Sequence, residues 1–437
     1  MRPDGASGRR GPGRAGWQRL GLLLLVVLPL AAAEPPPSEA PFTLGAIAFE
    51  GNAVTRDEVM RRETGLVAGD TVSAERLEQA RQAIQDLGLF RSVSLRRETW
   101  PEGERVVFIV EEKYYLLPLP RVEANADGDT GYGVQLRWSN IAGLNHRLRA
   151  LVVQRQYADS SRDAALTTVF NYDAPLIGGS RNSLRVALAH TDQRREPDPA
   201  PPYDERLNRI SLGLTRSLSP GPPSQGWMAG AGLDWQSQDS RGPLAPPDQG
   251  MATALQAQLG YRDLRFDLYS ERGTVFESSL LSTLGTLASD YAYLQADLAW
   301  RHFQPVGRLR HQSFNTLFQI GSYHGGPGQR PDPAYALGGS QLLRGYDRDR
   351  IEGDFRYVLG LEYLHPLGWD SVRLLALAEA GSAWPDASRG AGQPLYGSLG
   401  LGLRFRVSWF VNLDLEIGVA YPIGPDGEGL RVFAGSL

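Results

Sequence analysis

The sequence predicts a mainly β protein in which a sixteen-stranded antiparallel transmembrane β-barrel follows a small α/β module. Three observations carry this prediction. The chain opens with an export signal, residues 116–437 consist of period-2 segments about ten residues long, and no later segment is apolar enough for a spanning helix. An exported chain without a spanning helix is either secreted or a barrel. Long strands with a polar opposite face favour the barrel.

The export signal occupies residues 1–33. Arg9, Arg10, Arg14 and Arg19 precede the apolar run 20–30, and Ala31, Ala32 and Ala33 follow it. A basic start, a short apolar stretch and small residues at its exit are typical of a secretory signal peptide. The alternative is a membrane anchor, which needs about 18 apolar residues or more, and this run is shorter. The proline-rich residues 34–41 then read as a linker.

Residues 42–115 predict one small module with the element order β-α-α-β-β. The first strand begins at Phe42 and is closed by the turn signal Gly51-Asn52. Thr55 and Glu58 have the spacing of a capping box, so a short helix should follow. Ser73 should cap a longer helix that stops at Gly88. Two strands, 90–97 and 105–111, complete the module.

From residue 116 onward the pattern alternates between apolar and polar positions. In 412–421, for example, Leu413, Leu415 and Ile417 share one face, whereas Asp414 and Glu416 lie on the other. The predicted strands are 119–126, 131–139, 146–155, 164–173, 181–190, 206–216, 226–236, 252–262, 274–285, 291–301, 308–322, 355–365, 372–382, 396–407, 411–421 and 429–437. Short turns alternate with long loops, as they do between the two sides of an outer-membrane barrel.

Composition excludes several classes of function. Lys+Arg number 45 against 49 Asp+Glu, so the basic patch of a nucleic-acid binder is missing. The absence of cysteine excludes disulfides, thiolate metal sites and a cysteine nucleophile, and Lys113, the only lysine, is not part of a phosphate-binding loop. The six histidines are scattered and no Gly-x-Ser-x-Gly elbow occurs. We therefore expect no enzyme, cofactor or metal.

The long loop between the eleventh and twelfth predicted strands carries the most informative motif. Its residues 338–346 read Gly-Gly-Ser-Gln-Leu-Leu-Arg-Gly-Tyr, which resembles the Arg-Gly-aromatic loop motif of the BamA/TamA superfamily of outer-membrane protein assembly factors, with a bacterial surface antigen type barrel. Residues 42–112 resemble a single POTRA domain. Segments 270–273, 376–381, 400–404 and 412–414 resemble further family motifs, so the resemblance covers nearly the whole mature chain.

The resemblance implies a function in the outer membrane of a Gram-negative cell, with the POTRA domain in the periplasm. That function is insertion or translocation of polypeptides by strand augmentation. Implied partners are unfolded outer-membrane or secreted polypeptides, the lipid bilayer, and periplasmic chaperones or envelope scaffolds that bind the POTRA domain. Three alternatives stay open: a two-partner secretion type transporter for one exoprotein, a passive porin-like channel, and a structural scaffold that recruits envelope partners through its POTRA domain.

The resemblance also implies a site inside the barrel. The loop would fold back into the lumen, where acids on the wall hold Arg344, and parity nominates Glu379, Asp414 or both. Gly345 would let the backbone approach the wall, and Tyr346 would pack the loop tip. The alternative is a solvated arginine in an extracellular loop.

A client gate is predicted at the seam between the first and last strands. The first strand follows Pro118 and Pro120, which cannot donate backbone hydrogen bonds. The last strand contains Gly435 and ends at Leu437 without an aromatic anchor. Glu123 on the first strand and Gly435 and Leu437 on the last therefore mark the seam.

Overall fold

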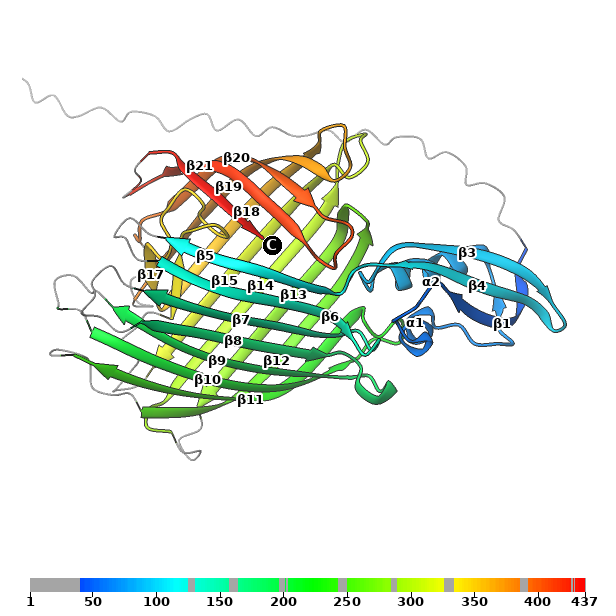
Figure 1. Ribbon diagram of the computed structural model, residues 1–437, viewed down its shortest axis with the longest axis horizontal. Helices are drawn as coiled ribbons and strands as arrows, with labels where there is room; N and C mark the ends of the chain where they lie inside the picture. Colours follow the sequence, from blue (N-terminus) through cyan, green and yellow to red (C-terminus); the bar gives the residue numbers. More distant parts are fainter. Residues whose placement is uncertain are drawn as a thin grey trace, which may run out of the picture. The chain divides into compact units, whose positions relative to one another are not determined.

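The computed structural model describes residues 40–124, 130–156, 164–195, 201, 203–242, 250–283, 289–325, 334–385, 392–425, 427 and 429–436 (Figure 1). The predicted signal peptide, most of the predicted linker and the seam residue Leu437 lie outside these ranges.

The N-terminal module, residues 42–112, is a four-stranded sheet covered by two helices. In chain order its elements are β1 (Phe42–Glu50), α1 (Asp57–Thr64), β2 (Thr71–Val72), α2 (Ala74–Gln85), β3 (Phe90–Trp100) and β4 (Gly103–Glu112). The sheet order is β2-β1-β4-β3, with β1 parallel to β4. Leu44, Met60, Ile84, Phe90 and Phe108 lie fully buried in its core. Burial of these side chains, each contributing about 1.5–3 kcal/mol, holds the helices on the sheet.

The two helix starts differ in how well the sequence predicts them. Ser73 caps α2 as expected, because its hydroxyl accepts a hydrogen bond from the Arg76 N–H at 3.2 Å. The capping box at α1 is wrong: Arg56 occupies the cap position and no side chain caps the helix. The Thr55 hydroxyl donates instead to Glu112 at 2.5 Å. A carboxylate is a stronger acceptor than the competing local partners, so a tertiary contact overrides the local signal.

Within the described ranges, sixteen strands form one antiparallel sheet, and the predicted fold class is confirmed. The strands are β5 (Leu116–Ala124), β6 (Thr130–Ile141), β7 (His146–Gln156), β8 (Ala165–Ala174), β9 (Asn182–Arg195), β10 (Tyr203–Ser217), β11 (Gly226–Arg241), β12 (Gly250–Asp267), β13 (Ser270–Thr283), β14 (Tyr293–Pro305), β15 (Ser313–Gly325), β18 (Phe355–Pro366), β19 (Val372–Trp384), β20 (Tyr396–Arg406), β21 (Asp414–Ile423) and β22 (Arg431–Ser436). A short 3-10 turn, η1 (Ile177–Gly179), joins β8 to β9, and a small ribbon of β16 (Tyr335–Leu337) and β17 (Ile351–Gly353) lies between β15 and β18 in the chain.

The strands present apolar side chains on one face and polar ones on the other. Leu212, Leu233 and Leu255 stand on neighbouring strands at 41–47% exposure. Their sequence neighbours on the opposite face include Asp234, which is 1% exposed and pairs with Arg209. The leucine face is the outer wall and the charged face is the inner wall, as a membrane barrel requires. None of the helices in the described part of the chain is long and apolar enough to cross a membrane.

The seam between the two edge strands is the least paired part of the wall. Six residue pairs join β22 to β21, whereas ten join β21 to β20. Among the described residues, no backbone pair joins β5, cyan in Figure 1, to β22, in red. Side-chain and connector contacts link the two edges. The Arg137 guanidinium of β6 donates to the Ser436 hydroxyl of β22 at 3.0 Å and to the Asn412 carbonyl before β21 at 3.4 Å. Tyr114 forms a parallel bridge with Phe410 beside β21.

The N-terminal module contacts several turns of the barrel. Asp86 at the end of α2 accepts a hydrogen bond from the Phe266 N–H of β12 at 2.8 Å. Glu63 of α1, which is 0% exposed, accepts from Ser224 before β11 at 2.8 Å. Burial raises the pKa of this carboxyl, and the bonds from Ser224 oppose the shift. Both acids thus bond barrel backbone or hydroxyl groups, which ties the helices to the turns.

Lys113, in the connector between β4 and β5, gives this junction a pH dependence. Its ammonium donates to the Gly88 carbonyl at 3.0 Å, and burial lowers its pKa from 10.5 to about 8. Between these values the unfolded state binds more protons, so stability should rise as pH increases from about 8 to 10.5. Urea unfolding midpoints of wild type and Lys113→Met, measured between pH 7.5 and 10.5, should therefore diverge. Parallel pH profiles would contradict the assignment.

Candidate functional site

The loop between β15 and β18 turns back onto the inner wall. Its tip is held by a buried cluster that Leu337, Leu343, Tyr346 and Ile351 form with Val358 of β18. Leu343 is fully buried although its φ is +52°. A bulky residue rarely adopts this left-handed conformation, so the surrounding packing must stabilise it. The tip therefore has one defined position, which places Arg344 next to the wall.

Arg344 is 6% exposed and lies among three glutamates of the inner wall. Its Nη2 donates to Glu362 Oε1 of β18 at 2.7 Å, and its backbone N–H donates to Glu379 Oε2 of β19 at 2.7 Å. Its Nε lies 3.7 Å from Glu379 and 3.6 Å from Glu416 of β21. The guanidinium carbon lies 5.5 Å from the centre of the Phe433 ring of β22. One side chain thus contacts four of the last five strands.

A second buried arginine partly offsets the charge of the three glutamates. Arg404 of β20 donates to Glu416 at 2.5 Å and to Glu362 at 2.8 Å. Two guanidinium groups therefore share three carboxylates, and Glu362 accepts from both of them. A buried charge is tolerated only when it is paired and hydrogen-bonded, so removal of either arginine would raise the formal excess of negative charge in the cluster from one to two.

The prediction for Asp414 is wrong. Its carboxylate forms a two-bond pair with Arg406, at 2.7 and 2.5 Å, and Arg406 also donates to Glu271 of β13 at 2.9 Å. Asp414 has the inward parity expected of it, but it stands two residues before Glu416 on β21. That offset, about 6.6 Å along a strand, takes it to a separate ion cluster.

Gly345 and Tyr346 lie where the motif suggested. A Cβ at Gly345 would meet the Pro422 backbone nitrogen at 2.7 Å, so only glycine fits between the loop and β21. The Gly345 N–H donates to the Ser398 hydroxyl of β20 at 3.0 Å. The Tyr346 hydroxyl donates to the Ile423 carbonyl at 3.0 Å, and its ring packs edge-on against Tyr396. The loop is therefore tied to every strand from β18 to β22.

Sequence reasoning missed Glu362, Arg404 and Ser398 as members of this site. Each occupies an inward position on its strand, and Glu362 stands in an otherwise apolar run, Leu359 to Leu364. A charged residue on the inward face of a strand opposite the Arg-Gly loop was the available signal. The alternation of inward and outward positions along each strand can identify acids on the inner wall. It cannot tell which of these acids lie at the same height in the barrel as Arg344.

Two family models match the chain in the regions just described. The model described as "Omp85 superfamily domain" matches residues 140–429, and the POTRA model, described as "Surface antigen variable number repeat", matches residues 42–113. The chain belongs to the Omp85 superfamily. Omp85 proteins are outer-membrane β-barrels with periplasmic POTRA domains, and the N-terminal module is the POTRA domain. A search of curated proteins finds no sequence match.

Solved structures of the Omp85 fold are similar to the chain at low sequence identity. BamA from Haemophilus ducreyi lacking POTRA domains 1–3 is 16% identical, with a TM-score of 0.53 over 90% of this chain and 84% of that one. CdiB from Acinetobacter baumannii is 16% identical, with a TM-score of 0.59 over 90% and 74%. CdiB from Escherichia coli is 14% identical, with a TM-score of 0.60 over 90% and 75%. At these identities the likeness establishes the Omp85 fold.

Proposed function

We propose that this Omp85 protein inserts or translocates polypeptides at the outer membrane of a Gram-negative cell by pairing a client strand with an edge of its own barrel. The observation that carries the proposal is the seam, where β5 and β22 lack a ladder between their described residues. Backbone groups at such an edge have no water to bond within the hydrocarbon, so a partner strand lowers their free energy.

The lumenal loop supports this proposal because it stabilises one side of the seam. Arg344 and Gly345 tie β18, β19, β20 and β21 together, and Arg344 lies over Phe433 of β22. The neighbouring β5 has no comparable contact with the loop among the described residues. β22 is an edge strand beside four strands that the loop holds in place. It is a suitable template for a client strand, since the register of β22 stays defined while its partner strand changes.

The POTRA domain offers further edges that suit client polypeptides. β3 is the outer strand of its sheet, and β1 pairs with the two-residue β2 at only two positions. Exposed strand edges recruit extended peptides by backbone hydrogen bonding. Periplasmic chaperones or envelope scaffolds would bind here as well. We propose no enzymatic step, since the work is an exchange of strand partners.

Photo-crosslinking in cell envelopes tests the function. A crosslinker at Val432 of β22, which is 76% exposed, should trap nascent outer-membrane barrels, identified by mass spectrometry. The same group at Leu233 of β11, 47% exposed in the middle of the paired wall, is the matched control and should trap no client. A single secreted exoprotein at Val432 would favour the two-partner secretion alternative. Equal patterns at both positions would contradict the proposal and leave the passive channel.

A further inference from the structure

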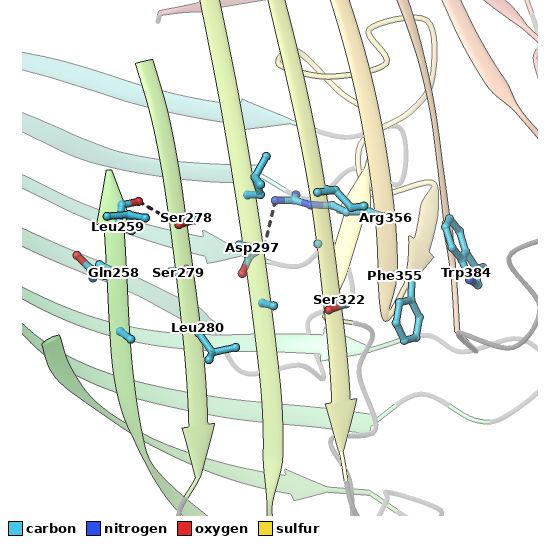
Figure 2. Close-up of a pocket in the computed structure, with 15 residues that line it drawn as sticks. Gln258, Leu259, Ser278, Ser279, Leu280, Asp297, Ser322, Phe355, Arg356 and Trp384 are labelled. Carbon is cyan, nitrogen blue, oxygen red and sulfur yellow. Dashed lines mark hydrogen bonds and ion pairs between the residues drawn. The ribbon is translucent and has the colours of Figure 1, made fainter. Parts of the chain in front are cut away.

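The outer wall near the extracellular end of β12–β19 carries a groove of about 510 Å³. Small residues form its floor, namely Ala257, Ser278, Ala296 and Ser322, which the strand register places on the outward face. Larger apolar side chains form its sides, among them Leu259, Leu280 and Phe355 (Figure 2). Leu259, Leu280 and Ile320 stand beside it at 43–46% exposure. Successive strands hydrogen-bond in register across this region, so the groove is a depression in a continuous wall.

The opposite side of the same wall is already occupied. Arg356 and Asp297 point into the barrel, where their charged groups lie 3.7 Å apart, and the Arg356 guanidinium lies 4.5 Å from the centre of the Tyr335 ring (Figure 2). A Cβ at Gly321 would meet that ring at 2.6 Å. The lumen is filled at this height, so the empty volume faces the bilayer.

The groove runs inward from the rim of the barrel. Its outermost members, Phe355 and Trp384, are the first residue of β18 and the last of β19, and their rings stack at 6.0 Å. At the other end, Ala257 is the eighth residue of β12. Aromatic side chains at strand ends mark the membrane interface. The groove therefore begins at the outer-leaflet interface and descends into the hydrocarbon.

Its dimensions correspond to one leaflet. Six strands cross it, and five spacings of about 4.8 Å give a length of about 24 Å. Because barrel strands tilt by about 35–45°, a row across them covers roughly 14–17 Å of height, more than half of the apolar band of about 25 Å. A lipid chain anchored at the extracellular interface would span this height.

We infer that the groove is a binding site for one acyl chain of a lipid in the extracellular leaflet. The groove is continuous with the bilayer-facing wall, and hydrocarbon chains are the molecules that surround that wall. One of its two floor hydroxyls is satisfied within the wall, because the Ser278 hydroxyl donates to the Leu259 carbonyl at 3.0 Å. A client strand does not fit, since every strand lining the groove is paired on both sides.

Filling the groove provides the first test. The full mature protein is reconstituted with phosphatidylglycerol of defined chain length, extracted in mild detergent and examined by native mass spectrometry. Wild type should retain one lipid, and Ala296→Leu combined with Ser322→Leu should reduce retention at least about tenfold, equivalent to about 1.4 kcal/mol. Ala150→Leu, an outward position on β7 paired with Leu136 and Phe170, should retain lipid like wild type.

Chain and headgroup dependence separate the possible outcomes. Retention should change with acyl-chain length and stay constant when phosphatidylethanolamine replaces phosphatidylglycerol. Retention that follows the headgroup, or that is equal in the filled variant, would overturn the inference. A dimer in place of a lipid adduct would assign the groove to a second copy of the chain and also overturn it.

A second measurement does not depend on the filled variant folding. Lipids brominated along the chain should quench fluorescence from Trp384, obtained as the difference between wild type and Trp384→Phe. That quenching should persist when brominated lipid is diluted to a fraction at which Trp227, an outward residue on β11, is no longer quenched. Equal quenching of both tryptophans would mean that lipid exchanges freely at the groove, and would overturn the inference.

Discussion

Arg344→Ala should release the loop from the inner wall and abolish most of the client-handling activity. The substitution leaves Glu362, Glu379 and Glu416 with Arg404 as their remaining arginine partner in the cluster. Breaking a buried pair by removing one partner costs about 3–5 kcal/mol, because the remaining charges stay buried. Limited proteolysis of the loop at 334–354 should accelerate, and crosslinking of clients at Val432 should fall together with it.

Two matched variants make this expectation specific. Arg348→Ala changes an arginine of the same loop whose side chain is 75% exposed, so its effect should stay within about 0.5 kcal/mol. Arg344→Lys keeps the charge but lacks the planar fork, so it should restore activity only in part. If Arg344→Ala handles clients as wild type does while its barrel is folded, the loop arginine has no part in the mechanism.

A disulfide across the seam should block client insertion while the barrel remains folded. The chain has no cysteine of its own, so a pair introduced at Glu123 and at one of residues 431–436 is unique. Arg431 is the first choice on β22. The two edge strands run antiparallel, so Glu123, next to the last residue of β5 (Leu116–Ala124), lies towards the same end of the barrel as the start of β22 (Arg431–Ser436). A covalent link removes the free edges, and client crosslinking should drop to the level of the Leu233 control.

The control for this experiment is a disulfide in a ladder that is already closed. Leu401 and Val419 are directly opposite each other on β20 and β21, so a bond between cysteines there adds no new restraint on strand partners. Heat-modifiable migration on gels verifies that each barrel is folded, and reduction should restore activity. Full activity with the seam bond formed would exclude the gate.

The sequence predicted most of the fold because local patterns and burial agree over long stretches. Alternation identified each barrel strand to within a few residues, and Ser73 predicted the start of α2. Two features were not predicted. β2 is only two residues long, and the Thr55 hydroxyl bonds to Glu112, 57 residues away, and does not cap α1. Both depend on tertiary partners, which no local window contains.

The sequence predicted that wall acids hold the loop arginine inside the barrel, but it predicted only some of the residues that do so. The Arg-Gly-Tyr motif nominated the loop, and parity nominated inward acids. The choice between Asp414 and Glu416 depends on the stagger between strands and on the height of the loop tip, and two residues along β21 separate the two ion clusters. Glu362 was missed for the same reason, since the alternation along β18 does not give its height relative to the loop tip.

The bridge between Tyr114 and Phe410 has a mechanical consequence. Tyr114 donates to the Trp409 carbonyl at 2.7 Å and accepts from the Val411 N–H at 3.4 Å. The bridge thus lies on the connector that joins the POTRA domain to β5. It is next to the periplasmic end of the seam, where the edge strands β5 and β22 have no backbone pairs between their described residues. A pull on the POTRA domain would load these two bonds together with the bonds of Asp86 and Glu63 to the barrel turns, before any complete ladder bears tension. Force applied to the POTRA domain from the periplasm would then open the seam from its periplasmic end. The connector would thus transmit that force to the seam.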